Sequence, residues 1–316
     1  MNSTTVREFF ILGFPELNDY KLPFFYLILF MYFMTICENL VIILLVSTSQ
    51  RLHSPMYFFL GHLSLTDIIL VTTIVPNMLD AVRREGSVMP FVGCLTQSYL
   101  YGGTVSAECF LLTAMSYDRY LAICKPLHYI SLMSPKLRYS LIVSSWGLSF
   151  MLLLISLLLV CYLDFCGPNV IDHFFCDYAP ILALSCSDTT VPNIEMIIIS
   201  IPIIVLPFLF VIISYVYIFN AIFGISSTSG RQKTFSTCSS HLVVVSTYYG
   251  SMLITYMVPS KGHSVTVNKF ISLLYIVLTP LLNPVIYSMR NKEIQSSAMK
   301  YLHIFCKKKL EQKKKT

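Results

Sequence analysis

Four acidic residues interrupt stretches of this sequence that are otherwise apolar, which makes them the first candidates for chemistry. They are Glu38, Asp67, Glu108 and Asp118. If these stretches cross a bilayer, each charge costs about 2.5–3.5 kcal/mol on insertion scales, so an acid there indicates a functional site. A rise of about 1.5 Å per residue places both Asp67 and Glu108 near the middle of the membrane.

Two carboxylates at one depth would repel each other, and two interpretations remove the conflict. Either one carboxyl group keeps its proton and joins a neutral hydrogen-bonded pair, or a cation binds between Asp67 and Glu108. Sodium is the candidate cation, and the sequence leaves both interpretations open. No other cofactor or metal is expected.

Catalytic motifs are missing from the sequence. It contains no HExxH, no GxSxG and no phosphate-binding glycine loop. His173 and Cys176 have the spacing of metal ligands, but Cys176 is better used in a disulfide. An intramembrane hydrolase built on Asp67 and Glu108 would need a second aspartate motif, which does not occur. The sequence therefore predicts a protein that is not an enzyme.

Membrane-spanning helices are the elements predicted to position these residues. Of the 316 residues, 55% are hydrophobic and 12% are charged, which is about half the charged fraction of a soluble domain. About 20 apolar residues cross the hydrocarbon as a helix, so the chain has room for about seven spans. Breaks of proline, glycine and charge place them at 22–49, 56–82, 91–121, 137–162, 193–223, 234–258 and 268–289.

The distribution of lysine and arginine predicts the orientation, because basic residues are retained on the cytoplasmic side. One side holds Arg51, Arg119, Lys125, Lys136, Arg138, Arg231, Lys233, Arg290, Lys292, Lys300 and the lysines at 307–309 and 313–315. The other side holds Arg7, Lys21, Arg83, Arg84, Lys261 and Lys269. The net charge of +6 then faces anionic lipid at the inner leaflet and indicates no nucleic-acid partner.

This orientation divides the all-α membrane protein into three parts. Residues 1–21 form an extracellular N-terminus, 22–289 form the seven-helix bundle, and 290–316 form a cytoplasmic tail. Within the tail, 290–305 is expected to lie on the inner surface as a short amphipathic eighth helix.

Several features fit modification on the predicted outer side. Asn2 begins a glycosylation sequon, Asn2-Ser3-Thr4. Four cysteines, Cys94, Cys166, Cys176 and Cys186, lie on the oxidising side and predict two disulfides, with three pairings open. On the inner side, Cys306 is a candidate for palmitoylation.

Motifs along the whole chain resemble those of the vertebrate odorant receptors of the tetrapod type, within the rhodopsin-like G-protein-coupled receptors. They are LHSPMYFFLGHLSLTD at 52–67, MSYDRYLAICKPLHY at 115–129, SY at 214–215, KTFSTCSSHL at 233–242 and PLLNPVIYSMRN at 280–291. Two departures are visible. Glu38 stands where the family usually has glycine, and Tyr248 stands where it usually has phenylalanine.

The resemblance implies a receptor of the plasma membrane that activates a stimulatory olfactory-type G protein and raises cyclic AMP. It favours the pairings Cys94–Cys176 and Cys166–Cys186. It also implies that Asp118 holds Arg119 in an ion pair at rest, and that Pro284 provides a hinge because proline donates no backbone hydrogen bond. The residues implied in coupling and activation are Asp118, Arg119, Tyr120, Tyr215, Tyr249, Asn283, Pro284 and Tyr287.

The resemblance places the ligand in the outer half of the bundle, between the third, fifth, sixth and seventh helices. The implied lining residues are Tyr101, Gly102, Val105, Ser106, Ile199, Ser200, Ile203, Met252, Leu253, Tyr256, Leu273 and Ile276. Such a wall is apolar with a few hydroxyl groups and suits a small, largely neutral volatile molecule. The third helix has no carboxylate at this level, so no salt bridge to an amine is expected.

A transporter or a ligand-gated channel is the alternative class. A transporter is expected to have paired broken helices in two related halves, and the sequence has no internal repeat. An odorant-gated channel of the insect kind would place its N-terminus inside, against the lysine distribution.

Overall fold

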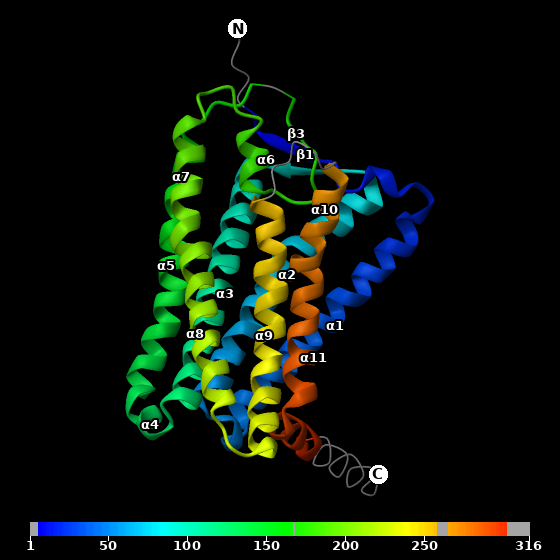
Figure 1. Ribbon diagram of the computed structural model, residues 1–316. Helices are drawn as coiled ribbons and strands as arrows, with labels where there is room; N and C mark the ends of the chain where they lie inside the picture. The colour runs from blue at the N-terminus through cyan, green and yellow to red at the C-terminus, as the bar shows by residue number, and fades with distance from the viewer. Residues whose placement is uncertain (1–5, 167, 258–264, 302–316) are drawn as a thin grey trace, which may run out of the picture.

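The molecule is a bundle of seven helical rods that lie side by side (Figure 1). The computed structural model describes residues 6–166, 168–257 and 265–301. Four rods are single helices before the long loop: α1 (Lys21–Thr48), α2 (Pro55–Arg84), α3 (Phe91–Cys124) and α5 (Pro135–Cys161). The fifth joins α7 (Thr190–Ser200), η4 (Ile201–Val205) and α8 (Leu206–Phe223), the sixth is α9 (Thr228–Met257), and the seventh joins α10 (Val265–Leu273), η6 (Leu274–Leu278) and α11 (Thr279–Arg290). The predicted all-α, seven-helix class is confirmed.

The bundle exposes apolar side chains and buries polar ones, which is the arrangement expected of a protein surrounded by lipid. Phe30 on α1 and Val143 on α5 are 63% and 69% exposed. Asp67 on α2 and Glu108 on α3 are both 0% exposed. Within the described part of the chain, five helices are long and apolar enough to cross a membrane. The rods α3 and α9 fall outside this set.

Prolines interrupt the backbone ladder of several rods. Pro202 lies in η4, a π-helical turn, and Pro284 lies inside α11. Proline has no N–H and its ring crowds the preceding turn, so helices widen or bend at such positions. In the seventh rod a second π-helical turn, η6, directly precedes Pro280. Both widened turns lie in rods that border the centre of the bundle.

The sixth rod begins earlier than the predicted residue 234. Helix α9 begins at Thr228, because Ser227 caps it. The Ser227 hydroxyl oxygen accepts a hydrogen bond from the backbone N–H of Gly230 at 3.2 Å, which satisfies a donor that the first turn leaves free. The connection from α8 is consequently shorter than predicted.

A small three-stranded sheet closes one end of the bundle, which we call the sheet end. Strand β1 (Glu8–Ile11) lies in the middle, antiparallel to β2 (Ser87–Pro90) and parallel to β3 (Val170–Ile171). Gly86, with φ of 128°, makes the turn from α2 into β2 beneath the ring of Phe10. The sequence predicted no strand in residues 1–21. The sequon at Asn2 lies outside the described residues.

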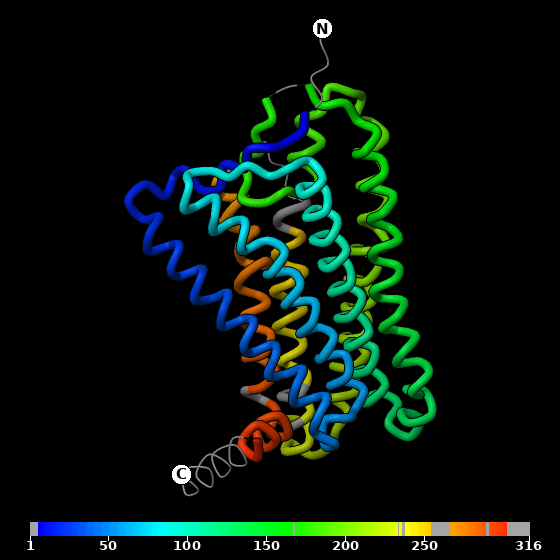
Figure 2. Tube along the Cα trace, turned by 180° about the vertical axis from the view of Figure 1, so that it is seen from behind, coloured from blue at the N-terminus to red at the C-terminus, as the bar shows by residue number. Residues whose placement is uncertain are grey.

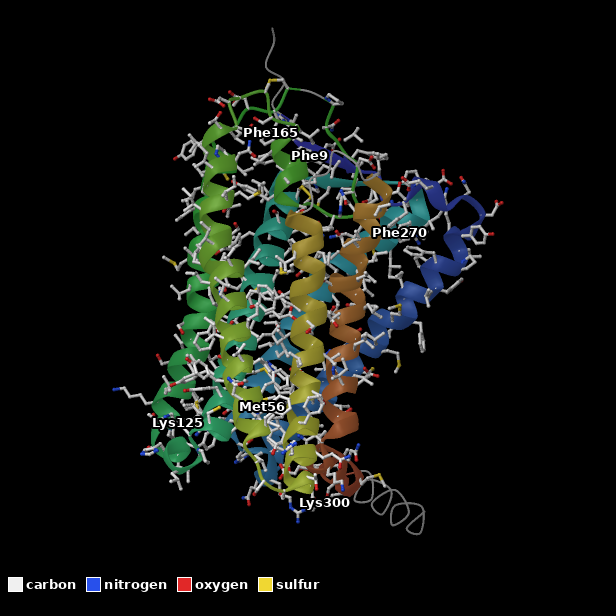
Figure 3. The ribbon with its side chains drawn as sticks, viewed as in Figure 1. Phe9, Met56, Lys125, Phe165, Phe270 and Lys300 are labelled. Atoms are coloured by element: carbon white, nitrogen blue, oxygen red, sulfur yellow. A yellow bond between two sulfur atoms is a disulfide. The ribbon has the colours of Figure 1, made fainter. Side chains whose placement is uncertain are left out.

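Aromatic packing joins the sheet to the long loop between α5 and α7. The ring centroids of Phe9 and Phe165 lie 5.8 Å apart. Both side chains lie at the sheet end (Figure 3). The N-terminal segment η1 (Pro15–Tyr20) leads into α1, and the loop contains the short helix α6 (Tyr178–Leu182). The N-terminal segment and the loop thus form one cap.

The opposite end holds short connections and one further helix. Segment η2 (Gln50–Leu52) joins α1 to α2, and η3 (Pro126–His128) with α4 (Tyr129–Leu132) joins α3 to α5. Here α1 and α2 lie side by side (Figure 2). After Asn291 the chain is helical over 292–301, within the predicted 290–305. Cys306 and the lysines at 307–309 and 313–315 lie outside the described residues.

Candidate functional site

A cavity of about 280 Å³ lies near the sheet end, between α3, α5, α6, α7 and η4. Its wall is largely apolar. Eight of the residues predicted from the sequence line it: Tyr101, Gly102, Val105, Ser106, Ile199, Ser200, Ile203 and Met252. Those on α3 share one face because residues three and four apart in a helix are neighbours.

The structure does not bring the other predicted residues to this wall. Leu253, Leu273 and Ile276 lie outside the cavity lining, and the side chain of Tyr256 is not among those described. The physical reason is a cluster of aromatic side chains that separates the seventh rod from the cavity. The hydroxyl groups of Tyr101 and Tyr275 are 2.9 Å apart, and the Tyr101 ring packs edge-on against Phe175 with centroids 4.8 Å apart.

Two parts of the wall were missed in the sequence. Helix α5 contributes Leu153 and Ser156, and the long loop contributes Asp177, Tyr178 and Ile181. Helix α5 gave little signal, because its buried face differs from its apolar exterior only by a few serines. The loop gave one indirect signal. Asp177 directly follows Cys176, and the predicted disulfide from Cys176 to Cys94 places this part of the loop beside α3.

Asp177 places a carboxyl group at the cavity. Its Oδ1 accepts a hydrogen bond from the N–H of Tyr178 at 2.8 Å. Burial raises the pKa of this carboxyl group to about 6, and the Tyr178 N–H works in the opposite direction. The third helix carries no acid at this level, and no sequence pattern indicated that the loop supplies one. The long loop therefore supplies a hydrogen-bond acceptor to the cavity wall.

A second acid, Glu195, joins α5, α6 and α7 beside the cavity. Its Oε1 accepts a hydrogen bond from the Ser156 hydroxyl at 2.6 Å, and its Oε2 accepts one from the Tyr178 hydroxyl at 3.1 Å. Both donors line the cavity. The network therefore fixes the side of the wall between α5 and α7.

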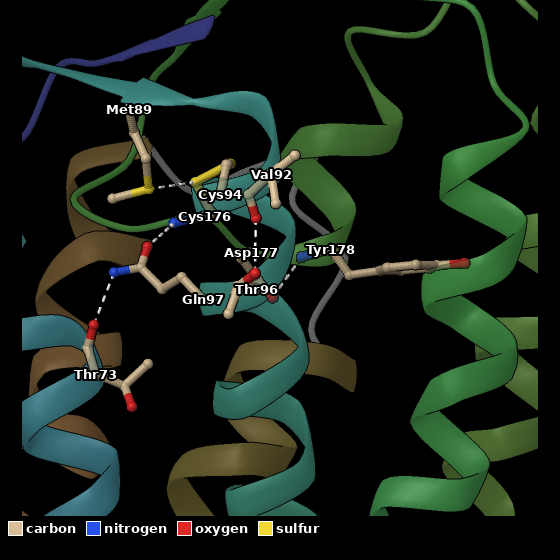
Figure 4. Close-up of a disulfide and its surroundings, with 9 residues drawn as sticks. All are labelled: Thr73, Met89, Val92, Cys94, Thr96, Gln97, Cys176, Asp177 and Tyr178. Carbon is tan, nitrogen blue, oxygen red and sulfur yellow. Dashed lines mark hydrogen bonds between the residues drawn. A yellow bond between two sulfur atoms is a disulfide. The ribbon is translucent and has the colours of Figure 1, made fainter. Parts of the chain in front are cut away.

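A disulfide holds the long loop over α3. Cys94 and Cys176 are bonded, and Gln97 supports the loop from below (Figure 4). The Gln97 side chain donates to the Thr73 carbonyl at 2.9 Å and accepts from the Cys176 N–H at 2.9 Å. The loop is thereby tied to both α2 and α3. The second disulfide, Cys166–Cys186, closes the loop on itself, so both pairings favoured by the resemblance are present.

A buried lysine ties the seventh rod to the same cap. Lys269 is 0% exposed, and its Nζ lies 2.6 Å from Asp172 and 3.7 Å from Glu16. Burial lowers the pKa of the neighbouring His173 to about 3, and the positive charge of Lys269 adds to this effect. His173 is therefore neutral at physiological pH, and Lys269 is the cation of this cluster.

Two tyrosines link the cavity to the centre of the bundle. The hydroxyl group of Tyr248 on α9 donates to the carbonyl of Val105 at 2.7 Å, and that of Tyr249 donates to the carbonyl of Cys109 at 3.2 Å. Val105 also lines the cavity. A ligand that displaces α3 against α9 would therefore act on these two hydrogen bonds. Tyr248, the departure from the usual phenylalanine, makes the shorter of them.

The predicted mid-membrane acids share one polar cluster. The Asn283 amide donates to both oxygens of Asp67, at 3.2 and 3.1 Å. Both Glu108 oxygens are buried and have no hydrogen-bond partner in the described structure. The same is true of the side-chain oxygens of Asn39 and Asn283. Glu38, the acid that departs from the family pattern, forms no hydrogen bond to Asp67 or Glu108.

The predicted ion pair is present at the opposite end. Arg119 lies 2.9 Å from Asp118, which is 0% exposed. Tyr129 on α4 donates a hydrogen bond to the other Asp118 oxygen at 2.7 Å, a contact the sequence did not predict. Because Asp118 has two donors, Arg119 is held against its own helix.

The predicted tyrosines surround this pair. The Tyr215 hydroxyl group lies 2.7 Å from Nδ1 of His241 on α9. The Tyr287 hydroxyl group is buried and has no hydrogen-bond partner in the described structure. Tyr120 packs edge-on against Tyr217 on α8 with ring centroids 6.0 Å apart. His241 was missed because a histidine in a helix gives no spacing signal.

These features define a seven-helix membrane receptor. It has a covered cavity at one end and an arginine paired with the neighbouring aspartate at the other. The family model described as "Olfactory receptor" matches residues 28–308. The chain is 43% identical to Olfactory receptor 1468 of Rattus norvegicus over 98% of each chain. It is 44% identical to human Olfactory receptor 11L1 over 96% of this chain and 95% of that one.

The chain therefore belongs to the olfactory receptor family. It is a G-protein-coupled odorant receptor, a multi-pass protein of the plasma membrane and a member of a family of receptors rather than enzymes.

Proposed function

We propose that this receptor binds a small, largely neutral volatile odorant in the cavity near the sheet end, and that it activates a stimulatory olfactory-type G protein to raise cyclic AMP. The observation that carries the proposal is the cavity of about 280 Å³, whose wall is mainly apolar with a few hydroxyl groups. Its size is at the lower end of small-molecule sites, which favours a compact ligand.

The sheet end is the extracellular end in this proposal. Both disulfides lie there, and disulfides persist in oxidising compartments. Lys125 directly follows α3 at the other end, and Lys136 and Arg231 lie there in the first turns of α5 and α9. Retention of basic residues in the cytoplasm makes this end cytoplasmic. The N-terminus is then outside and the described helix at 292–301 is inside.

Ligand binding and G-protein coupling are joined through α3 and α9. An odorant beside Val105 would change the geometry of the hydrogen bond from Tyr248 on α9. The resulting shift of α9 would change the contact between His241 and Tyr215. The released Arg119 then contacts the G protein. This is a two-state arrangement, in which the odorant favours the active state by binding it more tightly.

A panel of volatile compounds, screened by cyclic AMP in cells expressing the receptor, tests the proposal. A response that requires the stimulatory G protein supports it. A membrane current that persists without any G protein would favour the channel alternative, and uptake of the compound would favour a transporter. Any agonist found in this screen becomes the probe for the variants described below.

For the polar cluster we propose a bound sodium ion. Carboxylate and amide oxygens suit a hard cation, and both Glu108 oxygens and the Asn39 oxygen have no partner in the described structure. The ion would be held by Asp67 and Glu108, with Asn39 and Asn283 as further oxygen donors. The neutral hydrogen-bonded pair of carboxyl groups is the competing interpretation.

Replacing extracellular sodium by N-methyl-D-glucamine is expected to change odorant potency by about tenfold, within the usual range of coupling between sites. The variants Asp67→Asn and Glu108→Gln should lose this dependence, because each removes one charged ligand. Glu38→Gln is the matched control, since it removes an acid outside the cluster. Equal sodium dependence in the wild type and both cluster variants would contradict the proposal.

A further inference from the structure

A second cavity, of about 510 Å³, lies between α1, α2 and α5, away from the odorant cavity. We call it the lateral groove, and define it by His53, Phe58, His62, Leu65, Arg138 and Tyr139, which all line it. It lies at the proposed cytoplasmic end, where α1 and α2 are side by side (Figure 2). The activation mechanism uses none of these residues.

The polar part of the lateral groove contains one permanent cation, Arg138, in its described lining. Arg138 on α5, His53 before α2 and His62 on α2 line it, and its described lining contains no aspartate or glutamate. Nε of Arg138 and Nδ1 of His62 are buried and have no hydrogen-bond partner in the described structure. Arg138 also has no ion pair among the described residues. The guanidinium N–H of Arg138 is a donor in every state, and a buried donor is costly unless an acceptor reaches it. Arg138 therefore favours an anionic ligand in the groove.

The rest of the lateral groove is apolar and opens sideways to the lipid. Leu65 and Tyr139 are 39% and 61% exposed on the outside of the bundle. The ring of Phe58 packs edge-on against His62 and Tyr139, with centroids 5.1 and 5.2 Å away. These rings form a wall between α2 and α5. Such a surface can hold a hydrocarbon chain, which a soluble anion lacks.

The depth of these groups matches one leaflet. Arg138 lies in the first turn of α5, which begins at Pro135, at the level of lipid headgroups. His62 lies farther along α2, about 10 Å from Pro55 at 1.5 Å per residue. The polar groups of the lateral groove therefore extend from the headgroup level to the adjoining part of the acyl chains.

We propose that the lateral groove binds an anionic phospholipid of the cytoplasmic leaflet. Arg138 and His53 hold the headgroup phosphate, and one acyl chain lies along Phe58 and Leu65. A lipid without net charge fits less well, because it leaves the charge of Arg138 uncompensated and the described lining holds no acid. A sterol would leave Arg138 without an acceptor. The assignment to the cytoplasmic leaflet rests on the proposed orientation of the receptor.

Native mass spectrometry of the purified receptor tests this site, with phosphatidylserine and phosphatidylcholine as the probes. We expect one phosphatidylserine molecule to be retained in preference to phosphatidylcholine. Arg138→Gln should weaken this retention by about tenfold, which is the usual effect of losing a hydrogen bond to a charged group. Arg138→Lys should restore most of it, because the cation is kept.

Lys136→Gln is the matched control, because it removes one exposed cation from the same end of the same helix. Side chains two residues apart point away from each other on a helix, so Lys136 does not share the site. We expect this variant to change retention by less than about twofold, since exposed charges are screened. Equal losses in Arg138→Gln and Lys136→Gln would show general surface attraction and overturn the proposal.

Competition for bound phosphatidylserine on the wild-type receptor provides a second test. This test does not depend on whether any variant folds. Displacement of phosphatidylserine by glycerol 3-phosphate would indicate a site for a soluble phosphate, and displacement by cholesterol would indicate a sterol site. Either result overturns the proposal, and the failure of both competitors supports it. Neither odorant nor G protein is needed, so these outcomes are independent of the proposed function.

Discussion

Replacing Gly102 with valine is expected to raise the odorant concentration for half-maximal cyclic AMP by about tenfold to 100-fold. A Cβ atom at Gly102 would lie 2.9 Å from Cδ1 of Leu153, and both residues line the cavity. The branched side chain would therefore occupy ligand space, and overpacking of this kind costs about 1–3 kcal/mol. Full dose-response curves with the agonist from the panel measure the shift.

Gly147→Val is the matched control for this variant. Gly147 lies on α5 and faces the exterior of the bundle, and a Cβ atom there would meet nothing within 4 Å. It introduces the same side chain into a helix without filling the cavity, so potency should stay within about twofold of the wild type. Equal potency in Gly102→Val and the wild type would show that the odorant binds elsewhere. Surface expression of each variant separates loss of binding from loss of folding.

The seven rods could be predicted from the sequence because each must present an apolar exterior to lipid. The same requirement hid the contribution of α5 to the cavity. Leu153 and Ser156 line the cavity, but they lie in a helix whose buried face differs from its apolar exterior only by a few serines. The lining of α3 was easier to identify, because Tyr101, Gly102, Val105 and Ser106 share one face of a helix that also carries polar residues.

The remaining differences come from contacts between residues far apart in the chain. Strand β1 exists because Phe10 pairs with both Val88 and Val170, and no local pattern reveals such pairing. Tyr275 fills the side of the cavity assigned to Leu273 and Ile276, because its hydroxyl group meets that of Tyr101. Asp177 reaches the cavity only through the disulfide at Cys176. Tertiary contacts, rather than helix propensity, decide these positions.

Loss of the arginine at the opposite end is expected to have the other large effect. Arg119→Ala should reduce the odorant-evoked cyclic AMP signal to that of cells without the receptor. Arg119 is held by Asp118 at 2.9 Å in the resting arrangement, and the proposed mechanism releases it to contact the G protein. Removing the guanidinium group removes five donors with fixed geometry. The cyclic AMP response to a saturating odorant concentration measures the loss.

Odorant binding should survive in Arg119→Ala, because Arg119 does not line the cavity. On α3 it follows the last lining residue, Ser106, by about 20 Å at 1.5 Å per residue. Stabilisation of the purified variant by odorant in thermal unfolding, compared with the wild type, measures binding without the G protein.

Lys125→Ala is the matched control, since it removes an exposed cation from the same end of α3 and should leave the signal intact. A full cyclic AMP response in Arg119→Ala would contradict the docking role. Loss of both the response and the odorant-dependent stabilisation would instead show that Arg119 is needed for folding of the bundle. Asp118 would then be a buried acid with Tyr129 as its one remaining donor among the described residues.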